Sequence, residues 1–367
     1  MSLNIQNRTR KAQKKNKMMI TTCRSERANP DARNFGLRSR DPAQAASNAA
    51  RESFNKEKIG GLTENQQVNH FKDFLNYHAE NDSYIKDLRD IEIEHIDKYA
   101  ENLADRVSNE EIVGGTASNY LSSVNSLMFQ IAGHDELHSK AAAAYGIPGR
   151  TGIAKEDREV TESQLAEVKE NLSEHHAAML DLQREIGLRF EESAKFDAVS
   201  ASIDIEAGAS SILIEDGTKG SRDRFVELSN EAKDAVFNAA EIQQNARSMI
   251  PVDLSYKEFK NECYNAMRNE NISHHDLRHT YAYEQYSAGW KEKGFKDIEP
   301  PIRADIEPPE ASDRADMQRY LNDRIEYLEE KTGLSRNEVR ELEKEIRLDV
   351  SEKLGHSRVS ITNNYLG

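Results

Sequence analysis

Apolar side chains recur at spacings of three and four residues along much of the chain, and this pattern predicts a mainly helical protein. Between Leu62 and Tyr77 the apolar positions follow that spacing, and the stretches IEIEHIDKYAENLADRV and TASNYLSSVNSLMFQIAG continue it. We expect Thr116 or Ser118 to cap the last of these helices. Residues 62–147 are therefore predicted to form one compact helical domain.

The pattern changes once, at SILIEDGTKGSRDRFVEL. Two short apolar runs flank a turn that contains Gly217 and Gly220, which predicts an antiparallel hairpin. Helices precede it, with a capping box expected at Thr161–Gln164, and helices resume near Ser229. The second domain is therefore predicted to be mainly α-helical with a small antiparallel β-sheet, an α+β arrangement.

Composition shifts suggest the domain boundaries. Residues 1–58 hold RTRKAQKKNK and few large apolar side chains, and we interpret them as a flexible basic arm. GIPGRTG (146–152) separates the helical domain from a second domain at 155–367. Residues 291–335 are rich in proline and charge, and we interpret them as an insertion that either contacts a partner subunit or is a solvated decoration.

The charge distribution is asymmetric. The chain of 367 residues has a net charge of −15, yet residues 1–60 carry 14 Lys and Arg against 5 Asp and Glu. A basic segment on an acidic body can still hold phosphates. There is no apolar run long enough for a transmembrane helix and no secretory signal, and the two cysteines lie far apart. We therefore expect no membrane partner and a cytoplasmic location, associated with the nucleoid when the protein is bound to DNA.

Three clusters could carry chemistry: GLRFEES, the turn DGTKGSRDR, and HHDLRHTYA together with the distant LGHSRVSITNNY. They supply two arginines that can hold an anionic oxygen, two histidines that can donate or move protons, a turn lysine, and a tyrosine that can attack as a nucleophile. In chain order these residues are Arg189, Lys219, His275, Arg278, His356 and Tyr365. Such a set fits phosphoryl transfer through a covalent phosphotyrosine.

Simpler interpretations stand beside this one. Arg189 alone would be a helix-surface arginine, and Lys219 alone an ordinary turn lysine. His275 and His279 share a helix face, but Asp276 stands where a zinc protease motif has glutamate, so we expect no metal. Neither GxxxxGK[ST] nor GxGxxG occurs, so we also expect no nucleotide cofactor.

The order and spacing of two motifs resemble the tyrosine recombinase (phage integrase) family. HDLRHTYA is similar to the family's H-x-x-R box, with His275 as the first histidine and Arg278 as the second catalytic arginine. LGHS is followed by a tyrosine nine residues after its histidine, as in the family's LGH…Y ending. The resemblance therefore assigns His356 to the catalytic set and makes Tyr365 the nucleophile.

Further matches extend this resemblance over roughly 62–367. GLRFEE resembles the region of the first catalytic arginine, which implies that role for Arg189 and a supporting one for Glu192. TKGSRDRFVEL resembles the family's β-hairpin segment, and Lys219 falls at the position of the family's catalytic lysine. We expect His279 to be a packed histidine that supports the site. Residues 62–147 resemble the family's SAM-like core-binding domain, which clamps DNA.

The resemblance implies a site-specific recombinase or integrase that cleaves and rejoins double-stranded DNA through a 3′-phosphotyrosine, with no cofactor. It implies a dimer on each site, a tetramer in synapsis, and accessory DNA-bending or directionality proteins. We expect a mobile-element or prophage integrase. A chromosome or plasmid dimer resolvase, a type IB topoisomerase-like enzyme and a non-cleaving DNA-binding accessory protein are the alternatives.

Overall fold

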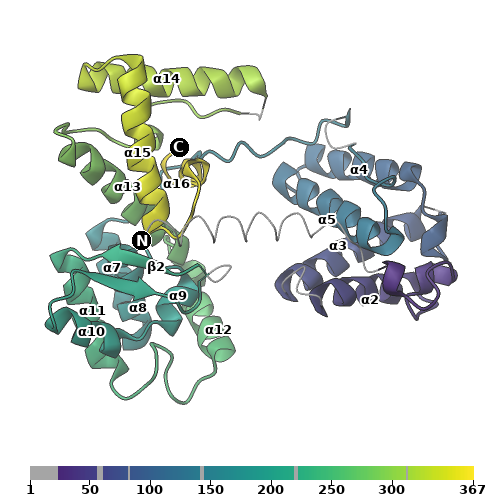
Figure 1. Ribbon diagram of the computed structural model, residues 1–367, viewed down its shortest axis with the longest axis horizontal. Helices are drawn as coiled ribbons and strands as arrows, with labels where there is room; N and C mark the ends of the chain where they lie inside the picture. The colour runs from purple at the N-terminus through teal and green to yellow at the C-terminus, as the bar shows by residue number, and fades with distance from the viewer. Residues whose placement is uncertain (1–23, 56–60, 82, 141–143, 219–221, 311–312) are drawn as a thin grey trace. The chain divides into compact units, whose positions relative to one another are not determined.

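The computed structural model describes residues 24–55, 61–81, 83–140, 144–218, 222–310 and 313–367. Its contacts divide the chain into two compact units, Met1–Arg150 and Thr151–Gly367 (Figure 1). Both units are built mainly of helices, and a two-stranded antiparallel sheet is the one sheet within the described ranges. The predicted fold class, mainly α with a small antiparallel sheet, is confirmed.

The regular elements described in the first unit are all helices. Its elements are η1 (Arg24–Glu26), η2 (Arg33–Gly36), α2 (Pro42–Asn55), α3 (Gly61–Glu80), η3 (Leu88–Asp90), α4 (Ile93–Ser108) and α5 (Gly114–Ala132). Phe71 and Phe74 of α3 are fully buried with Tyr99 of α4 and Leu127 of α5 in one apolar core. The helix α5 begins at Gly114 after Val113, so the prediction of a cap at Thr116 or Ser118 was wrong.

Residues 24–55 fold as part of this unit, whereas the sequence analysis placed them in the flexible arm. In α2, Ala45, Ala46, Ala49 and Ala50 are buried against α3 and α5. The Arg27 guanidinium, on the segment after η1, donates to the carbonyl oxygen of Ile131 at 2.8 Å. An alanine stripe buries little area per residue, which is why the scarcity of large apolar side chains was misleading. Residues 1–23 of the predicted arm lie outside the described residues.

The first half of the second unit surrounds the hairpin. Its elements are α7 (Glu162–Lys169), α8 (Glu174–Ile186), α9 (Phe190–Lys195), α10 (Ala198–Glu206), β1 (Ser211–Ile214), β2 (Arg224–Glu227), α11 (Asn230–Gln243), α12 (Tyr256–Ala266) and η4 (Met267–Asn269). The expected capping box is present, since Thr161 and Gln164 exchange backbone and side-chain hydrogen bonds. The buried faces of α8, α10 and α11 pack together with Ile212, Ile214 and Val226 of the sheet.

The predicted hairpin is confirmed at SILI and RFVE. β1 and β2 are antiparallel, with Ile212 opposite Val226 and Ile214 opposite Arg224. Burial alternates along β2, so that Arg224 and Val226 point inward while Phe225 is exposed. An arginine therefore occupies an inward position beside the apolar core. Lys219, which the sequence places between the two strands, lies outside the described residues.

The second half of this unit contains α13 (His274–Glu292), η5 (Pro301–Arg303), α14 (Arg314–Thr332), α15 (Arg336–Lys353), η6 (Val359–Thr362) and α16 (Asn363–Leu366). The residues predicted as an insertion, 291–335, contribute Ile298, Ile325 and Leu328 to the apolar core beneath α13 and α15. α14 packs on α15 within the same chain (Figure 1). This segment is thus a packed part of the unit and not a solvated decoration.

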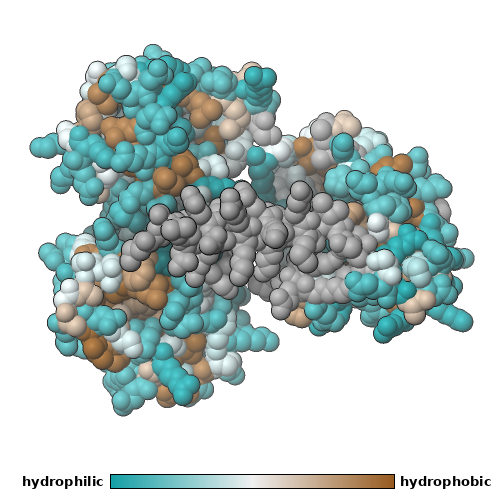
Figure 2. Space-filling view, in the orientation of Figure 1, coloured by the Kyte–Doolittle hydropathy of each residue, from teal (hydrophilic) through white to brown (hydrophobic). Residues whose placement is uncertain are grey.

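Hydrophilic residues dominate the face of the protein seen in Figure 2. The exposed large apolar side chains include Leu213 and Phe225, which are cross-strand neighbours on the outer face of the hairpin. No helix in the described ranges has the length and apolarity to span a membrane. Within the same ranges, no three His, Cys, Asp or Glu side chains are grouped so as to hold a metal ion.

Candidate active site

The site is built around the junction between α8 and α9. Gly187 ends α8 with a φ of +69°, and a Cβ atom there would overlap the ring of Tyr281. This left-handed turn reverses the chain direction, so that Arg189 stands at the start of α9. The Arg189 backbone N–H donates to Glu192 Oε2 at 2.8 Å, and its Nη1 donates to Glu192 Oε1 at 2.5 Å.

Glu192 organises the positive charges of the site. Its side chain is 0% exposed and accepts hydrogen bonds from Arg224 Nη1 at 2.9 Å and Nη2 at 2.8 Å. Arg278 Nη1 lies 3.9 Å from Glu192 Oε2. Burial acts to raise the pKa of Glu192, but the hydrogen bonds and charge of Arg224 and the charge of Arg189 lower it to about 2. One ionised carboxylate thus fixes three guanidinium groups.

Arg278 lies at the centre of this group and is 1% exposed. It projects from α13, and its terminal nitrogens donate to the carbonyl oxygens of Gly187 and Leu354. Its Nε donates to the Tyr365 hydroxyl oxygen at 3.2 Å. Burial lowers its pKa, and the Glu192 carboxylate acts in the opposite direction. Arg278 therefore connects the α8–α9 junction to the C-terminal segment.

The C-terminal end of α15 faces the same guanidinium groups. The Leu354 carbonyl oxygen also accepts from Arg189 Nη2 at 3.1 Å, and the Lys353 carbonyl accepts from Arg224 Nε at 2.8 Å. Carbonyl oxygens at the end of a helix have no partner inside the helix and carry partial negative charge, so cations stabilise them. Gly355 then turns the chain with a φ of +70° and leads into His356.

His356 lies against the first arginine. Arg189 Nη2 is 3.2 Å from His356 Nε2, and because a guanidinium only donates, this ring nitrogen accepts. The ring is therefore neutral, with its proton on Nδ1. Burial, followed by the charges of Arg189 and Arg278, lowers the pKa of His356 to about 4. The geometry and the electrostatics agree on a neutral imidazole near pH 7.

Tyr365 lies among these groups, on the short helix α16, and is 5% exposed. Its ring centroid is 4.9 Å from that of His279, 5.6 Å from His275 and 6.3 Å from His356. The Arg278 guanidinium carbon is 5.8 Å from the ring centroid. The nearly terminal tyrosine is therefore part of the buried cluster.

The two histidines of α13 differ in their environments. His279 is 3% exposed; burial lowers its pKa to about 4, while a hydrogen bond to the Tyr365 backbone acts in the opposite direction. His275 is exposed in part, and its ring lies against those of Tyr365 and His279. The protein around that ring and the Arg278 charge lower its pKa as well. The His279 ring is thus buried against the tyrosine ring, while His275 is exposed at the edge of the cluster.

The structure brings together most of the residues singled out in the sequence: Arg189, Glu192, His275, Arg278, His279, His356 and Tyr365. Lys219 is outside the described residues, so its predicted place in the site stays a prediction. Sequence reasoning missed Arg224, which donates to Glu192 through both of its terminal nitrogens. Its inward register on β2, opposite Ile214, was the available signal.

A cavity of 290 Å³ opens beside the cluster. Arg189, His275 and Arg278 line one part of it, and Tyr256, Lys260 and Tyr264 of α12 line another. The Lys260 ammonium group is 5.6 Å from the ring centroid of Tyr264. Cationic side chains and aromatic faces are the groups that bind phosphates and stack on nucleobases. The cavity can thus receive an anionic, aromatic-bearing ligand next to the buried arginines.

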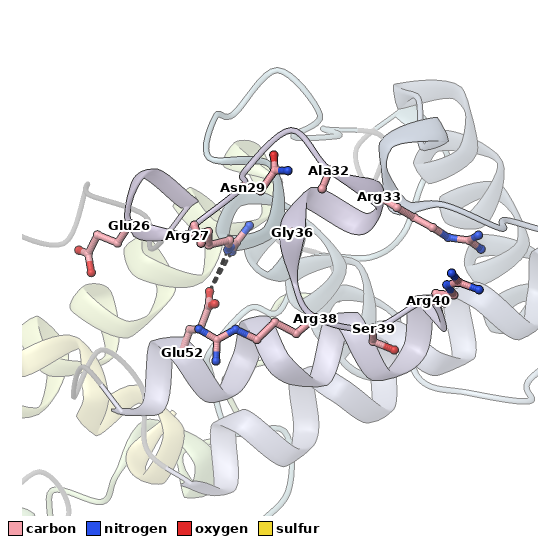
Figure 3. Close-up of a pocket in the computed structure, with 11 residues that line it drawn as sticks. Glu26, Arg27, Asn29, Ala32, Arg33, Gly36, Arg38, Ser39, Arg40 and Glu52 are labelled. Carbon is pink, nitrogen blue, oxygen red and sulfur yellow. Dashed lines mark hydrogen bonds and ion pairs between the residues drawn. The ribbon is translucent and has the colours of Figure 1, made fainter.

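The first unit holds a larger cavity, of 710 Å³, far along the chain from these residues. Figure 3 shows the ion pair of Arg27 with Glu52 at this cavity, at 3.0 Å. Arg33, Arg38 and Arg40 also line it, and their side chains are exposed. Three exposed guanidinium groups make this cavity suited to anions.

Two comparisons with known proteins found matches. The model of a family described as integrase matches residues 149–284, a segment that includes Arg189, Arg224 and Arg278 and ends before His356. This match confirms the resemblance to the tyrosine recombinase and integrase family. Among solved structures, one titled XerA recombinase is similar, with 14% identity, a TM-score of 0.32, and coverage of 88% of this chain and 93% of that one. No curated protein matches the sequence.

Proposed function

We propose that this chain is a tyrosine-type site-specific DNA recombinase that cleaves and rejoins DNA strands through a 3′-phosphotyrosine. One observation carries the proposal: the Arg278 guanidinium donates to the Tyr365 hydroxyl within a cluster that also holds Arg189 and His356. A potential nucleophile and the donors that would stabilise a phosphate thus occupy one site, although Arg278 and Tyr365 are far apart in sequence. The integrase family match to 149–284 supports the same function.

The proposed cleavage is a transesterification. Tyr365 Oη attacks the scissile phosphorus, a P–O bond to the tyrosine forms, and the P–O5′ bond breaks. The DNA end that carries the 3′-phosphate stays linked to the protein, and the other DNA end leaves with a free 5′-hydroxyl. A 5′-hydroxyl from another strand reverses the step, so the energy of the phosphodiester is retained.

The charges around Glu192 suit this reaction. Three guanidinium groups (Arg189, Arg224 and Arg278) surround a single carboxylate, so the site has an excess of positive charge for a phosphate whose negative charge grows in the transition state. Because the guanidinium groups are already fixed by hydrogen bonds, little reorganisation is needed when the phosphate binds. The carboxylate itself acts by positioning the arginines.

We assign the two proton transfers to two different groups. His275, whose pKa is lowered and whose ring contacts Tyr365, is the neutral base that takes the tyrosine proton. Lys219, which lies between β1 and β2 in the sequence, is the proposed acid that protonates the leaving 5′-oxygen. His356 is proposed to contact the phosphate together with Arg189.

DNA binding is proposed to involve both units. In the first unit, the exposed guanidinium groups of Arg33, Arg38 and Arg40 are placed to contact backbone phosphates (Figure 3). The 1–23 segment adds six Lys and Arg and no Asp or Glu. Phosphate contacts of this kind supply affinity that is independent of sequence and sensitive to salt. The 62–147 residues are proposed to clamp the duplex as a core-binding domain.

Among recombinase roles, we propose integration for a mobile element or prophage, with a dimer on each site and a tetramer in synapsis. The basic N-terminal segment supports this choice, because an additional DNA contact suits a complex that joins two different DNA sites. Strand exchange between two labelled duplexes would separate this role from that of a topoisomerase-like enzyme, which only relaxes supercoils.

Covalent trapping tests the function. The protein is mixed with DNA from both sides of its own gene, and with a pool of nicked duplexes from which the short fragment that carries the leaving 5′-hydroxyl diffuses away, then denatured with SDS. We expect a protein–DNA adduct with the wild type and none with Tyr365→Phe. The matched control is Tyr84→Phe, which alters an exposed tyrosine of the first unit and leaves the adduct unchanged. An adduct that persists in Tyr365→Phe would remove Tyr365 as the nucleophile.

A further inference from the structure

Arg347 of α15 binds the segment that carries Tyr365. Its side chain is 2% exposed, and its Nη1 donates to Asn363 Oδ1 at 2.9 Å and to Thr362 Oγ1 at 3.3 Å. Its Nη2 donates to the Gly367 carbonyl oxygen at 2.9 Å. The three acceptors lie on both sides of Tyr365 in the sequence, so one guanidinium holds the helix α16 at its beginning and at its end.

A second set of buried charges holds Arg347 itself. Its Nε donates to Glu343 Oε1 at 2.7 Å, and the Tyr286 hydroxyl donates to the same oxygen at 3.3 Å. Arg324 Nε, from α14, lies 3.3 Å from that oxygen as an ion pair. Burial acts to raise the pKa of Glu343, but the charges of Arg347 and Arg324 lower it. The 291–335 segment therefore contributes Arg324 to the support behind α16.

The short helix needs such support. α16 has four residues, and a helix of that length is not stable without tertiary contacts. Its apolar anchor is Leu366, which is fully buried. The Ala154 backbone N–H gives one further contact, to the Asn363 carbonyl oxygen at 2.8 Å. Arg347 thus supplies three of the polar contacts that hold this short segment in place.

A contribution to stability does not by itself explain the buried ion pairs of Arg347, Glu343 and Arg324. Buried ion pairs carry a desolvation cost that often equals or exceeds their attraction, so apolar side chains of similar volume stabilise a core equally well. A guanidinium group fixes the orientation of its partners. Its planar N–H donors form good hydrogen bonds only with acceptors in a narrow range of positions. A nucleophile misplaced by about 1 Å can lose roughly two orders of magnitude in rate.

We propose that Arg347 is a positioning residue for Tyr365, with Glu343 and the α14 residue Arg324 holding its guanidinium in place. This inference deepens the proposed function and rests on it, because it takes Tyr365 to be the nucleophile. Arg347 touches no reacting atom in this account; it acts through the backbone and side chains that surround the tyrosine. Its loss affects the rate of attack and leaves the phosphate-binding arginines in place.

The test measures the single-turnover rate of adduct formation at saturating nicked DNA. We compare the wild type with Arg347→Met, which keeps the side-chain volume, and Arg347→Lys, which keeps the charge and loses the fork. Arg340→Met, an exposed arginine on the same helix, is the matched control. DNA affinity and the thermal unfolding midpoint are measured for each protein. Hydrogen exchange of residues 359–367 reports on the segment itself.

We expect Arg347→Met to lower the rate about 100-fold with unchanged DNA affinity, and to speed hydrogen exchange in 359–367. Its unfolding midpoint should fall, because the buried Glu343 carboxylate loses a partner. Arg347→Lys should recover part of the rate, and Arg340→Met should match the wild type. An unchanged rate in Arg347→Met overturns the inference. A parallel loss of midpoint, affinity and rate in both Arg347 variants also overturns it, because the role is then merely structural. If the wild type forms no adduct, the proposed function itself fails, and the inference fails with it.

Discussion

The Glu192 carboxylate accepts hydrogen bonds from both terminal nitrogens of Arg224, at 2.9 and 2.8 Å, in a position closed to solvent. The pair joins α9 to the hairpin strand β2 and sets the position of the arginine cluster. Removing one member of a buried, hydrogen-bonded ion pair leaves a charge without compensation, which typically costs about 3–5 kcal/mol. The stability of the second unit therefore depends on the ionisation of the Glu192 carboxylate.

Glu192→Gln should lower the free energy of unfolding by about 3 kcal/mol or more at pH 7. The pKa of Glu192 is lowered in the folded protein to about 2, so its contribution is present above the ordinary glutamate pKa and is lost as pH falls from about 4.5 to 2. Urea unfolding at several pH values checks this. The difference between wild type and variant should shrink over that acidic window. A difference that stays constant down to pH 2 would contradict the assigned pKa.

Arg278→Lys should reduce adduct formation by about 100-fold or more, because lysine cannot reach the Gly187 carbonyl, the Leu354 carbonyl and the Tyr365 hydroxyl together. Single-turnover cleavage of nicked DNA is the measurement, with near-ultraviolet circular dichroism to confirm folding. Arg340→Lys, at an exposed position of α15, is the control and should cleave as the wild type does. Cleavage by Arg278→Lys at the wild-type rate would show that the forked guanidinium is not required.

Gly187→Ala should destabilise the protein more than Gly333→Ala does. Both glycines end helices with a φ of +69°, so each substitution carries the same left-handed strain of about 1 kcal/mol. A Cβ at Gly187 would also overlap Tyr281, whereas a Cβ at Gly333 meets no atom within 4 Å. Urea unfolding of the two variants isolates the packing contribution. Equal losses of unfolding free energy would show that Tyr281 moves aside at no cost.

His356 should remain neutral well below pH 6. Burial and the nearby arginines lower its pKa to about 4, so protonation is disfavoured in the folded protein. Because the unfolded chain binds this proton at a higher pH, the contribution of His356 to stability is present above about pH 6.5 and falls as pH decreases towards 4. NMR titration of the histidine ring protons, with His356→Gln to assign the resonance, measures it directly. A titration midpoint near 6.5 would contradict the observed contact with Arg189.

Replacing both Arg33 and Arg40 with glutamine should weaken DNA binding and flatten its salt dependence. The logarithm of the DNA association constant falls linearly with the logarithm of salt concentration, and each lost phosphate contact reduces the steepness of that line by about 1. Arg51→Gln is the control, because that arginine lies outside the cavity and is paired with Glu64. Fluorescence anisotropy at several salt concentrations gives both quantities. An unchanged slope in the double variant would exclude the cavity as a phosphate contact.

Much of the site could be predicted because its residues belong to motifs whose spacing can be recognised in a single sequence. HDLRH and LGHS with its following tyrosine indicated that His275, Arg278, His356 and Tyr365 act together, and the structure brings these side chains into one cluster. The hairpin was also predictable, because two short apolar runs flank glycines. Local pattern was sufficient in both cases.

The rest depended on tertiary contacts. Arg224 was missed because a charged residue in a strand normally faces solvent, and its inward position is explained only by the Glu192 carboxylate from α9. The folding of residues 24–55 was missed because Asn34 and the alanines of α2 are buried by partners far along the chain. The 291–335 segment was described by its charge, whereas its buried Ile325 and Leu328 decide where it packs.

The central claim is that Tyr365 becomes covalently linked to DNA. Trypsin cleaves after Arg358 and releases residues 359–367, a peptide in which Tyr365 is the one tyrosine. The trapped adduct is digested with trypsin and nuclease and then analysed by mass spectrometry. We predict a nucleotide attached to the 359–367 peptide at Tyr365. A nucleotide on any other peptide, or a fully unmodified 359–367 peptide from a sample that contains adduct, would contradict the account.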